Sequence, residues 1–400
     1  MTEGALADSD RGEPREASWS VGKLLRAARR RLALRNYTLL LVLGVVWIVF
    51  QFLTENIFLT PRNLSLLALQ SSIVSLAAIS AVMLIVTRNF DLSVGSAVAL
   101  VGTVLAILTV RMHVHPLLGC LAAIGVGLLM GAWQGLWVTR LGVSSFIVTL
   151  AGLLYFRGFS MIIADGTTIA PLPSGLTEFA TGFLGPAASI RLILLVTVLV
   201  LSFRAVELRR SARLGLVSET PARFLRGAIP ALVVAGAAIW VASFGGIPNL
   251  VLVLAFFATL AHLVMSRTRY GAQLYAIGGN PEAARLAGID VRKVIFINFV
   301  IAGLAYGVTG IALTARVSGS VPGSAGLFLE LDAIAAAIIG GTALAGGRGT
   351  IFGALLGALL MGSLNNGLSL MNVETFYQDT VRGVVLLLAV AIDQFGRRRG

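Results

Sequence analysis

The chain has 400 residues, of which 57% are hydrophobic and only 12% are charged. A soluble domain carries roughly 25% charged residues, so this composition and a mean hydropathy of +0.91 exclude an ordinary soluble domain and predict a polytopic membrane protein. The net charge of +13 therefore points to loops at a membrane surface in contact with lipid, and no nucleic-acid partner is expected.

Three regions are predicted along the chain. Residues 1–36 are polar and end in the basic stretch KLLRAARRRLALR. This is typical of a cytoplasmic tail and not of a signal peptide; its basic part is either a simple topology determinant or a segment that lies along the anionic inner leaflet, and the former is favoured. Residues 37–395 form the predicted transmembrane domain, and residues 396–400 form a short basic tail.

About twelve apolar stretches follow one another in the transmembrane domain. Most are long enough to cross about 30 Å of hydrocarbon, and they are expected to be helices because a chain in lipid must satisfy its own backbone hydrogen bonds. They cover residues 37–54, 64–86, 94–112, 115–138, 143–163, 186–204, 224–244, 247–266, 293–316, 331–346, 349–370 and 377–395. The predicted fold class is all-α. The tenth stretch, LDAIAAAIIGGTALAG, is short and rich in glycine, so it is either a full span or a re-entrant or broken helix.

The basic residues predict the orientation. With the N-terminus inside and an even number of crossings, both termini and the segments 87–93, 139–142, 204–226, 267–292 and 347–348 lie in the cytoplasm. Most of the 31 Lys and Arg residues fall there, with Lys293 at a span edge; the others are Arg62, Arg111, Arg157, Arg191, Arg316 and Arg382. This bias agrees with the positive-inside rule.

One cytoplasmic loop, 267–292, contains the polar stretch GGNPEAARLAGIDV at residues 278–291. Asn280 is a favoured N-cap, Pro281 suits the first helical position and Glu282 suits the positive helix start. Gly288 fits the position just past the helix end. The pattern predicts a helix over 281–287, which is too short to be stable alone. It is either an ordinary connector held by its own spans or a docking element for a partner protein.

Three motifs give the chain a family resemblance. The sequence EAARLAG at 282–288 has the spacing of the coupling loop of ABC importer permeases. The sequences RNFDLSVGSAVAL at 88–100 and GGTALAGGRGTIFGALLGALLMGSLNNGL at 340–368 resemble permease subunits of binding-protein-dependent sugar importers of the ribose and xylose type. The similarity covers most of residues 37–395. The additional region 164–245 is more similar to the xylose-type permeases.

This resemblance implies a type II-like ABC importer permease in the bacterial cytoplasmic membrane, carrying a monosaccharide such as D-xylose or another pentose. Its expected partners are a separate ATPase subunit, which binds ATP and Mg²⁺, a periplasmic or lipid-anchored sugar-binding protein at loops 164–185 and 317–330, and a second permease copy as a homodimer or a hetero-pair. The expected ATPase-coupling residues are Asn280, Pro281, Glu282, Ala283, Ala284, Arg285 and Gly288. The small alanines would let the helix sit close in a groove of the ATPase.

Polar residues within the spans are candidates for the substrate pathway. Asp91 is an ionisable residue at the mouth of a span; it either accepts a hydrogen bond from a sugar hydroxyl or caps the following helix together with Ser93. Neutral polar groups suit a sugar, although they also join neighbouring helices. The candidates are Gln70, Asn89, Asp91, Ser93, Gln134, Asn298, Asn365 and Asn366.

Several motifs are absent from the sequence. The only lysines, Lys23 and Lys293, lie in no phosphate-binding G-x-x-x-x-G-K-[ST] pattern, so no ATPase site, catalytic residue, bound cofactor or metal site is expected. The alternative, an ion-coupled secondary sugar carrier, would need membrane-embedded carboxylates and inverted repeats with broken helices. Asp332 and Asp379 lie near predicted span ends, which favours the importer. A purely structural scaffold leaves the capped cytoplasmic helix unexplained.

Overall fold

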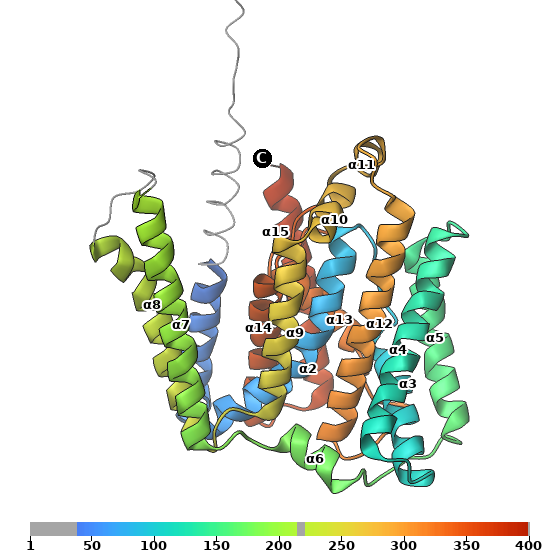
Figure 1. Ribbon diagram of the computed structural model, residues 1–400. Coiled ribbons are helices and arrows are strands. Elements are labelled where there is room, and N and C mark those ends of the chain that lie inside the picture. The colour runs from blue at the N-terminus through green and yellow to red at the C-terminus, as the bar shows by residue number, and fades with distance from the viewer. Residues whose placement is uncertain (1–37, 214–220, 399–400) are drawn as a thin grey trace, which may run out of the picture.

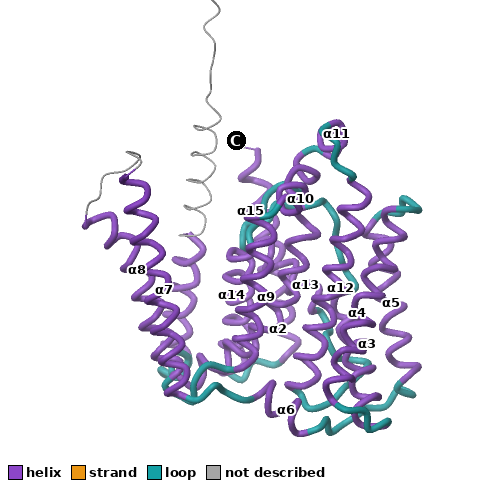
Figure 2. The backbone as a smooth tube through the Cα atoms, in the orientation of Figure 1, coloured by secondary structure: helices purple, strands orange, loops and turns teal. Residues whose placement is uncertain are grey.

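The computed structural model describes residues 38–213 and 221–398. The predicted tail 1–36, the middle of the basic loop 204–226 and the end of the tail 396–400 lie outside these residues. The described chain is built from helices and the loops between them, without a β-strand (Figure 2).

The first described helix covers Thr38–Leu53. The others are, in chain order, α2 (Pro61–Val86), α3 (Val94–Ala106) with a π-helical turn at Ile107–Arg111, α4 (Pro116–Thr139), α5 (Ser145–Ile163), α6 (Ser174–Thr181), α7 (Pro186–Arg213), α8 (Pro221–Ala242), α9 (Asn249–Arg267), α10 (Arg269–Gly279), α11 (Pro281–Leu286), α12 (Val291–Arg316), α13 (Leu329–Ile339), α14 (Ile351–Leu370) and α15 (Thr375–Arg398).

The all-α polytopic fold is confirmed, and every predicted apolar stretch coincides with a helix. Among the described residues, eight helices are long and apolar enough to cross a membrane, so the predicted count of about twelve is not confirmed. The tenth stretch forms α13, which has only 11 residues. At 1.5 Å per residue this helix is about 16 Å long and does not cross the bilayer, so the broken-helix alternative is correct.

Helix α2 is the centre of the bundle. It begins after Thr60, whose side chain accepts the backbone N–H of Asn63, and the missing N–H of Pro61 costs nothing at the first helical position. Of its most apolar 18-residue stretch, 89% is buried, against 11% for α7. Helices α7 and α8 pack mainly against each other, and Figure 1 shows them as a hairpin at one edge of the bundle. The apolar faces of that hairpin are therefore available to lipid.

Glycines bring α4 and α12 together over most of their length. A methyl group on Gly127 would overlap the carbonyl oxygen of Gly303, and one on Gly131 would overlap the carbonyl oxygen of Phe299. Small residues that let two backbones approach closely are the usual contact between helices in lipid, where burying apolar surface brings little gain.

Two helices begin inside the bundle. After α2 the non-helical segment 87–93 leads back into the interior, where α3 starts, and after α12 the segment 317–328 leads back to the start of α13. A methyl group on Gly95, near the start of α3, would overlap both the carbonyl oxygen of Gly326 and the carboxylate of Glu330 at the start of α13. The starts of α3 and α13 therefore meet in the core.

Helices α10 and α11, the start of the Thr38–Leu53 helix and the C-terminal end of α15 lie at one end of the bundle, and α6 lies at the other (Figure 1). We call these the α11 end and the α6 end.

Candidate functional site

The loop at the α11 end has the local structure that its sequence predicts. The Asn280 side chain accepts hydrogen bonds from the backbone N–H groups of Glu282 (3.0 Å) and Ala283 (3.1 Å). Pro281 is the first residue of α11, and Gly288 follows it with φ +81°. The predicted helix, its N-cap and the glycine past its end are therefore confirmed. The helix itself ends at Leu286, one residue before the predicted end at residue 287.

The face that α11 presents to the outside differs from the expected one. Ala284 is only 4% exposed and packs within its own chain, so it is not available to a partner. Leu286 is 90% exposed, and Glu282, Ala283 and Arg285 are exposed around it. Leu286 therefore marks the outward side of α11, although a single exposed apolar residue does not by itself indicate a partner.

A basic cleft of about 600 Å³ opens beside this loop, between the end of α4 and the start of α12. Arg140, Arg292 and Lys293 line it together with Asp290. The Asp290 carboxylate is already engaged, because it accepts the backbone N–H of Lys293 at 3.0 Å. The cleft therefore presents an excess of positive charge that suits an acidic partner surface.

Arg88 connects the loop to the interior of the bundle. Its guanidinium donates to the carbonyl oxygens of Gly278 (2.8 Å) and Gly279 (2.7 Å) at the end of α10. In the same place the Gly347 N–H donates to the carbonyl of Val86 at 2.9 Å. The last turn of α10, the end of α2 and the loop between α13 and α14 thus form one junction directly before α11.

The segment that leaves this junction, 87–93, reaches a fully buried polar cluster. Asp91 Oδ1 accepts from the backbone N–H (2.8 Å) and the hydroxyl (2.7 Å) of Ser93. Gln134 from α4 donates to the Ser93 hydroxyl at 2.5 Å. The Tyr306 hydroxyl from α12 donates to Asp91 Oδ2 and lies 3.2 Å from Gln134 Oε1. Asp91 therefore braces the turn before α3 through Ser93, but the predicted side-chain cap of α3 is not formed.

A second group holds the start of the same segment. Asn298 from α12 donates to the carbonyl of Met83 (2.8 Å) and to the Thr87 hydroxyl (3.2 Å). Asn89 donates to the carbonyl and the hydroxyl of Thr87, both at 3.1 Å. Five of the predicted pathway residues thus lie in the segment 87–93 or fasten it to α4 and α12. The five are Asn89, Asp91, Ser93, Gln134 and Asn298.

The remaining predicted pathway residues lie elsewhere. Asn366 exchanges two hydrogen bonds with Asn63 of α2 (2.8 and 3.0 Å), an arrangement that joins helices. Its neighbour Asn365 accepts from Arg382 of α15 at 2.7 Å. Gln70 is exposed on α2. The expected pair Asn365–Asn366 is therefore divided between two separate contacts.

The position of Asp332 near a span end was one argument against an ion-coupled carrier, and this argument is wrong. Asp332, placed near a span end by the sequence, is only 8% exposed, and so is Glu330. Both belong to α13, which begins in the interior. Buried carboxylates and broken helices are thus present in this fold.

Comparison with known proteins identifies the family. The family model described as the permease component of the branched-chain amino acid transport system matches residues 63–390. The chain belongs to this permease family. It is therefore a multi-pass membrane protein and a transport component, as its apolar helices also indicate.

Curated relatives of the permease are similar over nearly its whole length. The xylose transport system permease protein XylH of Haemophilus influenzae is 40% identical over 367 residues, 92% of this chain and 98% of the relative. XylH of Escherichia coli K12 is 38% identical over 372 residues, 92% and 94% of the two chains. The ribose import permease protein RbsC of the same strain is 34% identical over 356 residues, 88% and 92%. No solved structure matches the chain. The resemblance to the ribose and xylose type is confirmed.

Some residues of these sites carry no sequence signal. Tyr306 lies 215 positions from Asp91, and only the packing of α12 shows that it reaches the carboxylate. Arg88 stands within the motif at 88–100, but its partners at Gly278 and Gly279 are not predictable from that motif. Leu286 is visible in the sequence only as the one large apolar residue of EAARLAG, which does not show that it is exposed.

Proposed function

We propose that the permease is the membrane subunit of an ABC importer for a pentose, with D-xylose as the first substrate to test. The observation that carries this proposal is the 40% identity to a xylose transport system permease over 92% of the chain. The relatives named as ribose permeases are less similar, at 34%, which ranks xylose ahead of ribose.

The α11 end is the proposed ATPase contact, and it faces the cytoplasm. Helix α11 offers Leu286 on its outer face, with Glu282, Ala283 and Arg285 around it, while Asn280, Pro281 and Gly288 fix its two ends. Ala284 seats the helix on its own chain. The basic cleft beside it supplies a second contact for acidic groups of the ATPase. ATP and Mg²⁺ are bound by that subunit, and this chain supplies no cofactor site of its own.

The α6 end is the proposed outer face, where a periplasmic or lipid-anchored binding protein delivers the sugar. This places both termini in the cytoplasm, in agreement with the basic residues of the inner segments. The permease acts as a dimer in the cytoplasmic membrane, and lipid covers the apolar outer helices.

The test is reconstitution of the permease with the ATPase and binding protein encoded beside it. ATP-dependent uptake of D-xylose into proteoliposomes, faster than uptake of D-ribose, is the expected result. Sugar uptake by the permease alone under an ion gradient, without ATP, would instead identify an ion-coupled carrier. Uptake of ribose in preference to xylose would overturn the substrate assignment and leave the importer intact.

The docking face has its own test. Leu286→Asp places a charge on the exposed tip of α11 and is expected to release the ATPase during purification in mild detergent. Leu141→Asp is the comparison variant, because Leu141 is also an exposed leucine, in the loop between α4 and α5; it follows Arg140 of the basic cleft, so it tests the second proposed contact. Retention of the ATPase by the Leu286→Asp variant contradicts docking through α11.

A further inference from the structure

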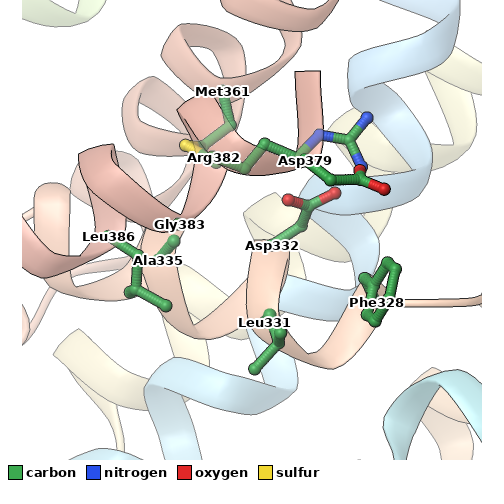
Figure 3. Close-up of a pocket in the computed structure, with 9 residues that line it drawn as sticks. All are labelled: Phe328, Leu331, Asp332, Ala335, Met361, Asp379, Arg382, Gly383 and Leu386. Carbon is green, nitrogen blue, oxygen red and sulfur yellow. The ribbon is translucent and has the colours of Figure 1, made fainter. Parts of the chain in front are cut away.

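A small cavity between α13, α14 and α15 contains a group of charged residues inside the apolar bundle. Its volume is about 120 Å³, and its lining includes Asp332, Asp379 and Arg382 with apolar walls from Phe328, Leu331 and Leu386. Figure 3 shows the Asp332 carboxylate pointing from α13 toward Asp379 and Arg382 of α15. Ionisable groups within a membrane domain are costly and usually mark a substrate or ion pathway.

Asp332 is the unusual member of this group. Its side chain is 8% exposed, yet within the described part of the chain its carboxylate accepts no hydrogen bond and forms no ion pair. It interacts only through space, favourably with Arg382 and unfavourably with Asp379. The carboxylate faces the cavity, so its acceptor sites are open to a ligand that donates hydrogen bonds.

Arg382 and Asp379, the other two charged residues, are held in place by hydrogen bonds but keep further hydrogen-bonding capacity. Arg382 donates to Asn365 through Nε (2.7 Å) and to Asp379 through one terminal nitrogen (3.2 Å). These bonds use two of the five N–H groups of the guanidinium. Asp379 is 37% exposed and Arg382 is 24% exposed. The cavity thus presents acceptors on both carboxylates beside spare donors on one guanidinium.

The wall of the cavity shows backbone strain. Phe328, the residue before α13, has φ +61°, a conformation that bulky side chains rarely adopt. Such strain collects at binding sites because the surrounding structure must enforce it. Here it turns the chain into α13 and places the Phe328 ring in the lining of the cavity (Figure 3).

We propose that this cavity is a sugar subsite on the transport route, in which Asp332, Asp379 and Arg382 hold hydroxyl groups of a pentose. The inference rests on the proposed function. Sugar hydroxyls donate to the two carboxylates and accept from the guanidinium, which supplies the donor that Asp332 lacks. The C–H groups of the ring lie on the apolar walls. A cavity of about 120 Å³ has room for several water molecules, and therefore for one edge of a pentose.

Other ligands fit less well. Two carboxylates repel an anionic lipid headgroup or a phosphate. No group of three or more His, Cys, Asp or Glu side chains among the described residues is arranged to hold a metal ion, and Arg382 lies where it would repel a cation. A neutral molecule with several hydroxyl groups satisfies all three charged residues at once.

The first experiment measures ATP-driven D-xylose uptake by the reconstituted importer carrying Asp332→Asn. Loss of a hydrogen bond to a charged group is expected to lower uptake at limiting sugar by roughly tenfold to a hundredfold. Glu374→Gln is the matched control, because Glu374 is exposed just before α15, and it should leave uptake unchanged. If the wild type takes up D-xylose and Asp332→Asn does so at the same rate, the subsite is overturned and the proposed function stands. If the wild type takes up no D-xylose, the proposed function itself is overturned.

The second experiment leaves the charged residues in place. Leu331→Cys and, as a control, Glu374→Cys are introduced into the full chain with Cys120→Ser, which removes the only native cysteine. Leu331 lines the cavity and is 41% exposed, so a water-soluble maleimide should label Leu331→Cys. Saturating D-xylose should slow this labelling several-fold, sorbitol at equal osmolarity should not, and Glu374→Cys should not respond. Equal labelling rates with and without D-xylose overturn the proposal, even if Asp332→Asn fails to fold.

Discussion

Replacing Arg88 by alanine should uncouple the α11 loop from the interior of the permease. The guanidinium makes two hydrogen bonds, to Gly278 and Gly279. A hydrogen bond to a charged group contributes about 1.5–3 kcal/mol, but Arg88 is exposed, and exposed charge pairs contribute only roughly 0.2–1 kcal/mol. Because the bond to Gly278 is partly buried, each bond is taken in the upper half of that range, at about 0.5–1 kcal/mol. The two bonds together then contribute about 1–2 kcal/mol, which corresponds to a factor of about 5 to 30 in an equilibrium.

The quantity to measure is sugar taken up per ATP hydrolysed, in proteoliposomes that contain the permease, its ATPase and its binding protein. The Arg88→Ala variant should lower this ratio about 5- to 30-fold. The ATPase should still co-purify, because α11 and its exposed Leu286 are unchanged. The loss therefore lies in transmission from the loop to segment 87–93, and not in docking.

Two further substitutions separate the side chain from the backbone. Arg88 has φ +64°, which glycine adopts freely and alanine does not. If the guanidinium carries the coupling, Arg88→Gly and Arg88→Ala should lose it equally, and Arg88→Lys, which keeps the charge on a single donor group, should lose less. A normal ratio in Arg88→Ala, or a normal ratio in Arg88→Gly alone, would refute the reasoning.

The other predictions concern packing and buried polar groups. Gly278→Ala should abolish transport, because the added methyl overlaps the Val86 carbonyl, whereas Gly279→Ala has free space and should transport normally; uptake by the two variants checks this. Gly127→Ala should lower the melting temperature in detergent through a loss of about 1–3 kcal/mol or more, while Gly125→Ala on the same helix meets no atom within 4 Å and should be neutral or stabilising. Tyr306→Phe removes a donor from a buried carboxylate and should cost about 1–3 kcal/mol of stability, measured by thermal unfolding of the purified chain.

The membrane-spanning helices were predictable because the apolar composition and the length of a stretch determine whether it forms a helix in a membrane. A stretch of about 20 apolar residues forms a helix to satisfy its backbone, so the predicted stretches and the observed helices coincide. Helices α6 and α10 were not predicted, because they are short and less apolar. Helix α13 was left open, since its glycines at Gly340 and Gly341 fit either a full span or a break; the structure ends the helix there.

The arrangement of side chains was predictable only where it is local. The cap by Asn280 and the turn at Gly288 depend on neighbouring residues, and both are present. The contact between Asp91 and Tyr306 depends on how α12 is rotated against α3, which no local pattern sets. The sequence also could not predict that Ala284 is buried and Leu286 exposed. A helix of six residues is too short to show a hydrophobic periodicity.

Broken helices and buried carboxylates do not by themselves distinguish an ABC permease from an ion-coupled carrier. Both kinds of transporter must hold a polar substrate inside lipid, and a helix that starts in the interior supplies unpaired N–H groups and irregular backbone for this purpose. What differs is the source of energy. An ion-coupled carrier has to change the protonation or ion occupancy of its buried carboxylates, while a permease driven by a separate motor needs a rigid contact from its surface to its interior. This chain has such a contact, from Leu286 on α11 through Gly278 and Arg88 to the segment that carries Asp91. The same segment is fastened by α4 and α12, so a displacement of α11 has a direct structural route to the buried ends of α3 and α13.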